Sequence, residues 1–217
     1  MKPIDPRARR TIAHYDEDPA GFWEATRAHD VTQNRRALLE ALDGDGPFDL
    51  LDLGCGPGRD LLAFRELGHR AIGVDGCAAF VTMARATSGC EVWHRDLLAL
   101  ELPAARFDGI FANASLFHVP TSELPRVLGE LARALRPRGV LFSSNPRGDN
   151  EEGWNGDRWG AYHDLDAWRR YLEEAGFREE SHYFRPEGRP REEQRWLCVV
   201  ARIGALGDDQ NSAPRAK

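Results

Sequence analysis

Features that would direct a chain to a metal, a nucleic acid or a disulfide framework are missing from this sequence. Its four cysteines are scattered, with no C-x-x-C pair and no His partner at zinc-ligand spacing, so we expect isolated thiols that fill the core. No cluster of His, Asp and Glu shows metal-ligand spacing either. The formal net charge of -6 argues against a surface built to bind many phosphates.

Long apolar runs are missing as well. No apolar segment follows Met1, and no stretch approaches the roughly 20 apolar residues that a transmembrane helix needs. Neither a signal peptide nor a membrane span is therefore predicted, and we expect a cytosolic (cytoplasmic) protein. At 217 residues the chain is long enough for one well-buried domain and too short for two comfortable ones.

The two ends of the chain differ from its middle. Residues 1–18 are rich in Pro, Arg and Asp and predict a mobile arm, whereas residues 19–42 predict one helix. Residues 203–217 lack an apolar period and predict a frayed tail. We therefore expect an N-terminal arm and lid helix over 1–42, the main domain over 43–202, and a flexible tail thereafter.

Short apolar runs alternate with helical stretches through the main domain, and they lack the period of two that marks a half-exposed strand. The expected strands cover residues 48–53, 70–75, 90–95, 107–113 and 139–145. The expected helices cover residues 59–67, 77–86, 121–135 and 164–175, and an antiparallel pair covers 177–184 and 195–202. This order predicts a single doubly wound, Rossmann-like α/β domain with a mostly parallel sheet and an antiparallel C-terminal hairpin strand. Its ligand is expected at the carboxyl ends of the strands.

A glycine-rich loop joins the first expected strand to the first helix that follows it. Residues 51–60 read Leu-Asp-Leu-Gly-Cys-Gly-Pro-Gly-Arg-Asp, and the glycines let the backbone turn tightly and approach a ligand. The G-x-G-x-G spacing lacks the later third glycine of a dinucleotide fingerprint. Asp60 also places a carboxylate where a pyrophosphate would lie. The loop therefore favours a ligand without phosphates and makes an oxidoreductase the least favoured function.

The loop resembles motif I of class I S-adenosylmethionine (SAM) methyltransferases, hydrophobic-Asp-Leu-Gly-Cys-Gly-x-Gly, and the resemblance covers residues 45–145. Its Gly-Arg-Asp ending is similar to the form found among small-molecule and chalcogen methyltransferases. Residues 136–142 are similar to the family's motif III. The resemblance implies SAM as the cofactor and S-adenosylhomocysteine as its product. Such enzymes position an acceptor lone pair in line with the methyl group and share no catalytic triad.

The resemblance also implies a cofactor site at the strand ends. Asp75 is expected to accept hydrogen bonds from ribose hydroxyls, with a helix cap as the alternative. Asp96 is expected near the adenine amino group, with turn formation as the alternative. Asp52 is expected to hold the methionine ammonium group and Tyr15 to lie near the SAM carboxylate. The full set expected at the cofactor is Tyr15, Asp52, Gly54, Cys55, Gly56, Gly58, Arg59, Asp75, Gly76, Asp96, Leu97 and Asn113.

The loop after the fourth strand is similar to the segment that lines the reacting methyl group in small-molecule enzymes of the family. Asn113 and His118 are the candidates for contacting an acceptor, and Tyr162 completes the expected catalytic residues. His118 would accept a proton near neutral pH if the nucleophile must lose one. A structural hydrogen bond to the backbone is the alternative, and the sequence leaves both open.

Two segments are expected on the substrate side. Residues 145–164 predict a long polar loop whose aromatic and Arg side chains bind a small molecule, with a solvent-facing loop as the alternative. One face of the N-terminal helix predicts a lid, with a solvated face as the alternative; it consists of Trp23, Arg27, Asp30 and Asn34. The residues expected to bind substrate are Trp23, Arg27, Asn34, His118, Arg147, Trp154, Arg158, Tyr162 and His163.

These features predict methyl transfer from SAM to a nitrogen, sulfur or oxygen atom of a small polar or heterocyclic acceptor, by in-line displacement. A tRNA or protein methyltransferase is the first alternative, but residues 113–116 read Asn-Ala-Ser-Leu where base-methylating enzymes carry Asn-Pro-Pro-Tyr. A SAM-binding regulator that transfers no methyl group is the second. We expect a small-molecule partner and neither nucleic acid nor membrane, and the oligomeric state is left open.

Overall fold

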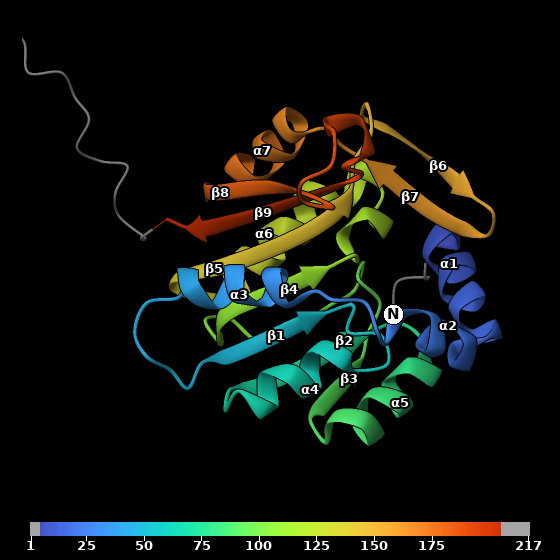
Figure 1. Cartoon of the computed structure of the whole chain (residues 1–217), viewed down its shortest axis with the longest axis horizontal. Coiled ribbons are helices and arrows are strands. Elements are labelled where there is room, and N and C mark those ends of the chain that lie inside the picture. The colour runs from blue at the N-terminus through green and yellow to red at the C-terminus, as the bar shows by residue number, and fades with distance from the viewer. Residues whose placement is uncertain (1–4, 205–217) are drawn as a thin grey trace, which may run out of the picture.

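The computed structural model describes residues 5–204, which form a seven-stranded sheet with helices on both faces (Figure 1). The strands lie in the order β3-β2-β1-β4-β5-β9-β8. Their bounds are β1 (Asp49–Leu53), β2 (Arg70–Asp75), β3 (Glu91–His94), β4 (Phe107–Asn113), β5 (Leu135–Pro146), β8 (Phe177–Arg185) and β9 (Trp196–Ile203). The first five strands pair in parallel, whereas β9 pairs antiparallel with both β5 and β8. The predicted doubly wound fold with an antiparallel C-terminal pair is confirmed.

The helices cover the sheet because each buries an apolar stripe against it. On one face lie α3 (Thr32–Ala41), α4 (Arg59–Glu66) and α5 (Ala78–Ser88). On the other lie α6 (Leu124–Ala134) and α7 (Leu165–Glu174). β1 is buried along its whole length, with Leu50 in the core cluster on the first of these faces and Leu51 in the cluster on the second. Strands buried on both faces explain why the apolar runs show no period of two.

The N-terminal region differs from the prediction of a mobile arm and a single helix over 19–42. Residues 5–42 form three helices: α1 (Pro6–Glu17), α2 (Pro19–Thr26) and α3. The side chains of Asp5 and Asp18 cap α1 and α2 by accepting from backbone N–H groups, and a proline follows each cap at the first helical position. Because α2 ends at Thr26 and α3 begins only at Thr32, Trp23 and Asn34 lie on different helices, and the predicted common helix face does not exist.

The predicted long polar loop over 145–164 is also corrected. β5 continues to Pro146, and the following residues form a hairpin of β6 (Glu151–Asn155) and β7 (Arg158–Tyr162). Gly156 and Asp157 make a two-residue turn, with Gly156 at a φ of +60°. Trp154 and Trp159 are cross-strand partners with ring centroids 5.3 Å apart.

The extra elements gather at one end of the sheet. Figure 1 shows α1 and α2 beside the carboxyl ends of β1 and β4, with the β6–β7 hairpin on the same side of the molecule. The four cysteines are free thiols, three of them buried. No helix within residues 5–204 has the length and apolar character to cross a membrane. The predicted tail lies outside the described residues from position 205 onward.

Candidate functional site

Two adjoining cavities lie at the carboxyl ends of the parallel strands. The larger has a volume of about 590 Å³ and the smaller about 110 Å³. They share five lining residues: Tyr15, Phe22, Gly54, Gly56 and Ala114. The cavities therefore form one binding region that runs across the glycine loop, at the place where open α/β sheets bind ligands.

The glycine loop forms the floor between the two cavities. Gly54 has a φ of +70°, and a Cβ there would come within 2.4 Å of the Ser115 Cβ. Gly56 has a φ of +52°, and its missing Cβ leaves open space that faces Phe22 at 3.8 Å. Gly58, in contrast, packs against the backbone of Ala84 and does not line either cavity. The loop is therefore a cradle that a side chain at position 56 would fill.

Asp75 holds this cradle in shape from the end of β2. Its Oδ2 accepts from the Gly56 N–H at 2.9 Å, and its Oδ1 accepts from the Cys77 N–H at 2.8 Å. Burial raises the pKa of Asp75, although these two backbone donors oppose the shift. Each carboxylate oxygen can accept a second hydrogen bond, so Asp75 remains able to bind a pair of hydroxyls from the small cavity.

The small cavity has apolar walls and a polar edge. Phe22 of α2 and Phe80 of α5 contact each other with centroids 4.9 Å apart, and Ile12 of α1 lies over the same space. Asp96 also lines this cavity, and its Oδ1 accepts from the Leu98 N–H at 2.9 Å. A flat heterocycle with exocyclic polar groups fits such walls.

Asp52 has the most unusual environment in the large cavity. Only 3% of it is exposed, and its Oδ2 has no hydrogen-bond partner. The neighbouring Asp60 forms ion pairs with Arg35 (2.6 Å) and Arg59 (2.7 Å). Burial, and then the negative charge of Asp60, raise the pKa of Asp52 well above its usual value. A ligand cation beside Asp52 would satisfy its free oxygen and favour its charged form.

His118 belongs to a hydrogen-bond chain of fixed direction. Its Nδ1 donates to the Trp159 carbonyl at 2.6 Å, because a carbonyl only accepts. Its Nε2 therefore accepts from the Tyr15 hydroxyl at 2.9 Å. Burial lowers the pKa of His118 to about 4, so the imidazole is neutral at physiological pH. Both ring nitrogens already form hydrogen bonds within the protein. This agrees with a structural role for His118, the alternative to a proton acceptor.

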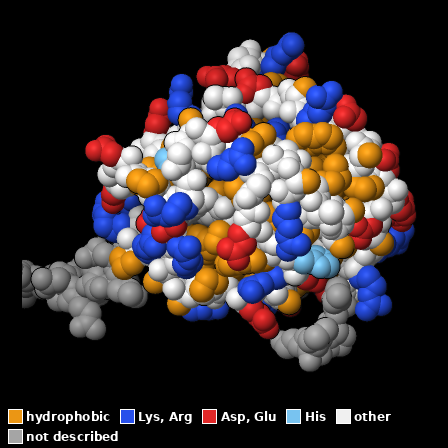
Figure 2. Space-filling model, turned by 90° about the horizontal axis from the view of Figure 1, so that it is seen from below, with side chains coloured by type: hydrophobic (Ala, Val, Ile, Leu, Met, Phe, Trp, Pro, Cys, Tyr) orange, Lys and Arg blue, Asp and Glu red, His pale blue; other side chains and the backbone are white. Residues whose placement is uncertain are grey.

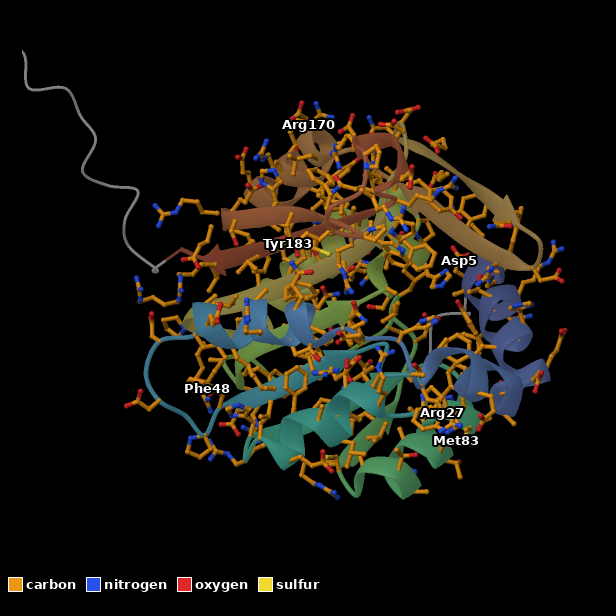
Figure 3. All side chains as sticks on the ribbon, viewed as in Figure 1. Asp5, Arg27, Phe48, Met83, Arg170 and Tyr183 are labelled. Atoms are coloured by element: carbon orange, nitrogen blue, oxygen red, sulfur yellow. The ribbon has the colours of Figure 1, made fainter. Side chains whose placement is uncertain are left out.

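A second polar network joins the end of β4 to α3 and β8. Asn34, 1% exposed, donates to Asn113 Oδ1 at 2.8 Å. Its Oδ1 accepts from the Tyr183 hydroxyl at 2.8 Å and from Arg185 Nη1 at 3.0 Å. Figure 3 shows Tyr183 between the antiparallel edge of the sheet and α3. Asn34 thus fixes the orientation of Asn113 and Arg185, which both line the large cavity.

The helix α1 covers the small cavity and is tied to the β6–β7 hairpin. Thr11 Oγ1 accepts from the Trp159 N–H at 2.9 Å, and the guanidinium of Arg7 lies 5.2 Å from the Trp159 ring. Arg10 stacks on Trp154 at 4.5 Å and pairs with Asp157. The two elements that the sequence did not predict therefore form one roof over the site.

The structure brings most, though not all, of the expected residues together. Eleven of the twelve residues expected at the cofactor line one or both cavities, and the exception is Gly58. On the substrate side, Trp23, Asn34 and Arg158 line the large cavity and His118 lines the small one. The remaining expected residues line neither cavity: Arg27, Arg147, Trp154, Tyr162 and His163.

Each of the outlying residues has contacts elsewhere. Arg27 is exposed and pairs with Glu24 of α2 at 2.8 Å. Arg147 donates to two backbone carbonyls of the segment between β8 and β9. Trp154 is 42% exposed under Arg10, and the buried His163 ring lies against α7, parallel to Trp168. Tyr162 lies at the end of β7, 6.3 Å from the Phe117 ring centroid.

Several lining residues were not selected from the sequence: Ile12, Phe22, Phe80, Phe117, Ser144, Arg185 and Trp196. Phe22 and Phe80 had the ordinary pattern of helix residues that pack on a core. Arg185 is the last residue of β8 and Trp196 is the first residue of β9. The sequence pattern predicted these two strands but gave no sign that their ends contact a ligand. No local motif marks these side chains as ligand contacts, because their shared position depends on how β8, β9 and the helices come together.

Comparison with known proteins shows that the chain is similar to methyltransferases over part of its length. A family model described as a methyltransferase domain matches residues 50–139. Trans-aconitate 2-methyltransferase of Azoarcus sp. (strain BH72) is 38% identical over 57% of this chain and 49% of that protein. Malonyl-[acyl-carrier protein] O-methyltransferase of Serratia marcescens is 32% identical over 70% of this chain and 58% of that protein. The chain spans about half the length of these curated relatives.

The fold has a match along nearly the whole chain. The 1,6-didemethyltoxoflavin-N1-methyltransferase of Burkholderia thailandensis was crystallised with 1,6-didemethyltoxoflavin and S-adenosylhomocysteine. It shares a TM-score of 0.72 and 23% identity, over 94% of this chain and 93% of that chain. The segment matched by the family model, residues 50–139, contains the glycine loop, Asp75 and Asp96. Residues 50–139 thus match a methyltransferase domain, and the chain shares the fold of this S-adenosylhomocysteine-bound class I methyltransferase.

Proposed function

We propose that this chain transfers the methyl group of SAM to a nitrogen, sulfur or oxygen atom of a small polar or heterocyclic molecule by in-line displacement. The observation that carries the proposal is the pair of cavities joined across the glycine loop, with Asp75 in one and the unpartnered Asp52 oxygen in the other. These two carboxylates lie at the carboxyl ends of β2 and β1, on either side of the loop.

The small cavity suits the adenosine part of the cofactor. Asp75 would accept from the two ribose hydroxyls while its backbone hydrogen bonds keep its oxygens fixed. Phe22 and Phe80 offer flat apolar contact to the adenine ring, and Asp96 would accept from its amino group. Asp75 also orders the loop that leads into α5, but the cap of that helix is Cys77, whose side chain accepts from the Phe80 N–H.

The large cavity suits the methionine part and the acceptor. Asp52 would pair with the ammonium group, which satisfies its buried oxygen. Arg59 is held by Asp60 and by the Thr26 carbonyl, so its side chain forms the wall of the cradle near α2. When bound, the cofactor supplies an activated methyl group on a positively charged sulfur.

The protein's contribution to such a reaction is position and exclusion of water. The sulfonium loses its charge on transfer, so the chain needs to align the acceptor and keep solvent out. The Tyr15–His118 hydrogen bond holds α1 against the loop after β4, which closes the small cavity. Asn113, oriented by Asn34, lies where β4 ends in the large cavity. We assign His118 a positioning role on the same grounds.

A small acceptor is favoured over a nucleic acid. The face in Figure 2 carries Lys and Arg side chains interspersed with Asp and Glu. Affinity for nucleic acid comes from clustered positive charge, and the net charge of -6 opposes it. A roofed cavity of about 590 Å³ has the size of small-molecule sites. The relatives named for methyl transfer to trans-aconitate and to 1,6-didemethyltoxoflavin support the same class of acceptor.

Calorimetric titration with SAM, S-adenosylhomocysteine and NADH tests the cofactor. We expect the first two to bind and NADH not to bind, and we expect Gly56→Leu to reduce SAM affinity more than about 100-fold because its side chain fills the cradle. The matched control is Gly44→Leu. Gly44 also has a positive φ, of +91°, and nothing lies within 4 Å of its Cβ position, so the variant reproduces the backbone strain without touching the cavity.

Three outcomes would contradict the proposal. Binding of NADH alone, or of none of the three ligands by folded protein, would remove the cofactor assignment. Equal loss of SAM affinity in Gly56→Leu and Gly44→Leu would show that the loop acts through stability. SAM binding without label transfer from methyl-labelled SAM into any small-molecule, tRNA or protein pool would identify a non-methylating SAM-binding protein.

A further inference from the structure

We propose that the acceptor is a small carboxylic acid, bound by Arg158 and Arg185, and that the product is its methyl ester. The proposal rests on the SAM-dependent methyl transfer proposed above and selects one acceptor chemistry among the nitrogen, sulfur and oxygen atoms left open there. Two independent observations carry it: the neighbouring imidazole has no free nitrogen, and two cavity arginines lack an acidic partner within residues 5–204.

The first observation concerns proton acceptors. His118 donates through Nδ1 to the Trp159 carbonyl and accepts through Nε2 from Tyr15. The hydrogen-bond chain Tyr15–His118–Trp159 therefore runs in one direction. A nucleophile that must first lose a proton would find no free lone pair on His118.

The other titratable side chains along the large cavity are already engaged or lie at its rim. Asp60 is paired with Arg35 and Arg59, and Asp52 faces the place assigned to the ammonium group. The carboxylate of Asp30 accepts from the Thr32 N–H at the start of α3. Of the histidines among residues 5–204, His29 alone lines the large cavity, from the exposed linker between α2 and α3. An acceptor that is already ionised at neutral pH fits this set of groups.

The second observation concerns unpaired positive charge. Three arginines line the large cavity, and Arg59 has Asp60 as its partner at 2.7 Å. Within residues 5–204, no carboxylate lies within ion-pair distance of Arg158 or Arg185. Both are half-buried in a cavity wall, where a guanidinium without a counterion favours an anionic ligand.

Arg185 is also held in place, as a binding residue should be. Its Nη1 donates to Asn34 Oδ1 at 3.0 Å and its Nη2 donates to the backbone carbonyl of Asp30 at 2.7 Å. Asn34 is almost completely buried and is itself fixed by Asn113 and Tyr183. Each Arg185 nitrogen keeps a further N–H for a ligand, since the guanidinium has five donors. The buried network therefore presents the arginine to the cavity in one orientation.

The remaining walls suit the carbon skeleton of a small acid. Phe117 and Trp196 supply apolar surface, and Ser144 supplies a hydroxyl, at the ends of β4, β5 and β9. In the reaction, a lone pair of the carboxylate oxygen forms the new O–CH₃ bond while the S–CH₃ bond breaks and its electron pair stays on sulfur. The negative carboxylate and the positive sulfonium become a neutral ester and a neutral thioether. No proton is transferred, which agrees with the absence of a free base on His118.

The test uses the full chain with SAM labelled in its methyl group and a protein-free extract of small molecules as the acceptor pool. Methyl esters release volatile methanol on mild base treatment, whereas methylated amines, thioethers and aryl ethers do not. We expect the label to be base-labile. The rate at saturating acceptor and saturating SAM should be constant between about pH 6 and pH 8, because a carboxylate has a pKa near 4 and needs no deprotonation there.

Variants then assign the arginines, with a defined small dicarboxylate or tricarboxylate from the labelled pool as substrate. Arg158→Ala and Arg185→Ala should each raise KM for the acid at least about 10-fold and leave SAM affinity unchanged by calorimetry. Arg178→Ala is the matched control, since Arg178 lies on the same strand as Arg185, is exposed, and lines neither cavity.

The outcomes separate this proposal from the proposed function. A base-stable product, or a rate at saturating SAM that rises with pH, would overturn the carboxylic acid while SAM-dependent transfer stands. Label transfer with unchanged KM in both arginine variants would also overturn it. Failure of the wild-type protein to bind SAM would instead remove the proposed function itself, whatever the acceptor.

Discussion

The two ends of β1 show how the same residue type builds structure at one end of the sheet and a binding site at the other. Asp49 and Asp52 are three residues apart in one strand, and both are less than a tenth exposed. At the amino end, Asp49 is surrounded by the guanidinium groups of Arg70 (2.7 Å), Arg136 (2.8 Å) and Arg106 (3.2 Å). At the carboxyl end, Asp52 has an oxygen with no partner.

The pKa values of the two carboxyls move in opposite directions for this reason. Hydrogen bonds from Arg70, and then from Arg136 and Arg106, hold the pKa of Asp49 well below its usual value. Burial and the charge of Asp60 raise the pKa of Asp52. The arginines show the same contrast, since Arg136 bridges Asp49 and Asp108 while Arg158 and Arg185 lack carboxylate partners within residues 5–204. Unpaired buried charge therefore separates a ligand site from a structural ion network.

Removing the charge of Asp49 should have the largest effect on the fold. In the variant Asp49→Asn, three guanidinium groups lose their common carboxylate and an amide N–H faces them. We expect the free energy of unfolding at pH 7 to fall by about 1 to 2 kcal/mol, because the buried carboxylate loses hydrogen bonds from guanidinium groups that are themselves 37–57% exposed to solvent. Urea unfolding measures it. SAM affinity of the folded variant should be unchanged.

The control for this variant lies at the same end of the molecule. Asp45 is exposed and forms no ion pair or hydrogen bond within residues 5–204, so Asp45→Asn should unfold like the wild type. The pH dependence adds a second check. Because the folded pKa of Asp49 is depressed, its stabilisation is present above about pH 4 and is lost as pH falls below that value. Equal acid sensitivity of wild type and Asp49→Asn would contradict the assigned ion network.

Asp52→Asn should have the opposite effects from Asp49→Asn, with stability kept and SAM affinity reduced. The substitution removes a buried charge that has no partner in the free protein, so stability at pH 8 should not fall below that of the wild type. SAM affinity should fall about 10-fold to 100-fold, because a hydrogen bond to a charged group contributes roughly 1.5–3 kcal/mol. Calorimetry at pH 8 gives the affinity. An Asp52→Asn protein that binds SAM as tightly as the wild type would show that the ammonium group lies elsewhere.

The raised pKa of Asp52 also predicts a proton linked to binding. In the free protein the carboxyl keeps its proton to a higher pH than usual, whereas a bound ammonium group favours the charged form. SAM affinity should therefore fall by up to tenfold per pH unit as pH drops through this raised pKa. Titrations in buffers of different ionisation enthalpy should detect a released proton in that range. Asp52→Asn should release none, and a wild-type protein whose SAM affinity is independent of pH would contradict the linkage.

The sequence predicted the parts of the molecule that local patterns encode. The strand runs, the glycine loop and the acidic strand ends are each continuous in the chain, so the fold and the residues around Gly54 and Asp75 could be predicted together. The acceptor side is different. Arg185, Trp196 and Asn34 meet only because β8 and β9 turn back antiparallel beside β5 and bring distant segments to one cavity.

Two wrong predictions, the mobile N-terminal arm followed by one helix and the long polar loop, could have been avoided from local sequence patterns. Asp5-Pro6 and Asp18-Pro19 each place a capping side chain before a proline at the first helical position, which predicts two helix starts. Asn-Gly-Asp between two tryptophans predicts a tight hairpin turn at Gly156. Both segments are rich in polar residues, and this composition favoured the interpretation as a mobile arm and a polar loop. No such signal exists for the contacts between α1 and the hairpin, because they depend on tertiary packing.

The smallest predicted effect concerns the roof over the site, which consists of α1 and the β6–β7 hairpin. Arg10 and Asp157 pair at 2.6 Å, but about half of each side chain is exposed, and exposed pairs contribute little. Asp157→Asn should therefore increase the SAM dissociation rate less than about 5-fold in stopped-flow measurements, since Arg10 keeps its stacking on Trp154 and Thr11 keeps its hydrogen bond to the hairpin. Trp154→Ala removes the stacking surface and should act more strongly. If Asp157→Asn were as damaging as Asp52→Asn, the roof would depend on a surface ion pair, and unpaired buried charge would no longer be what distinguishes the site from its surroundings.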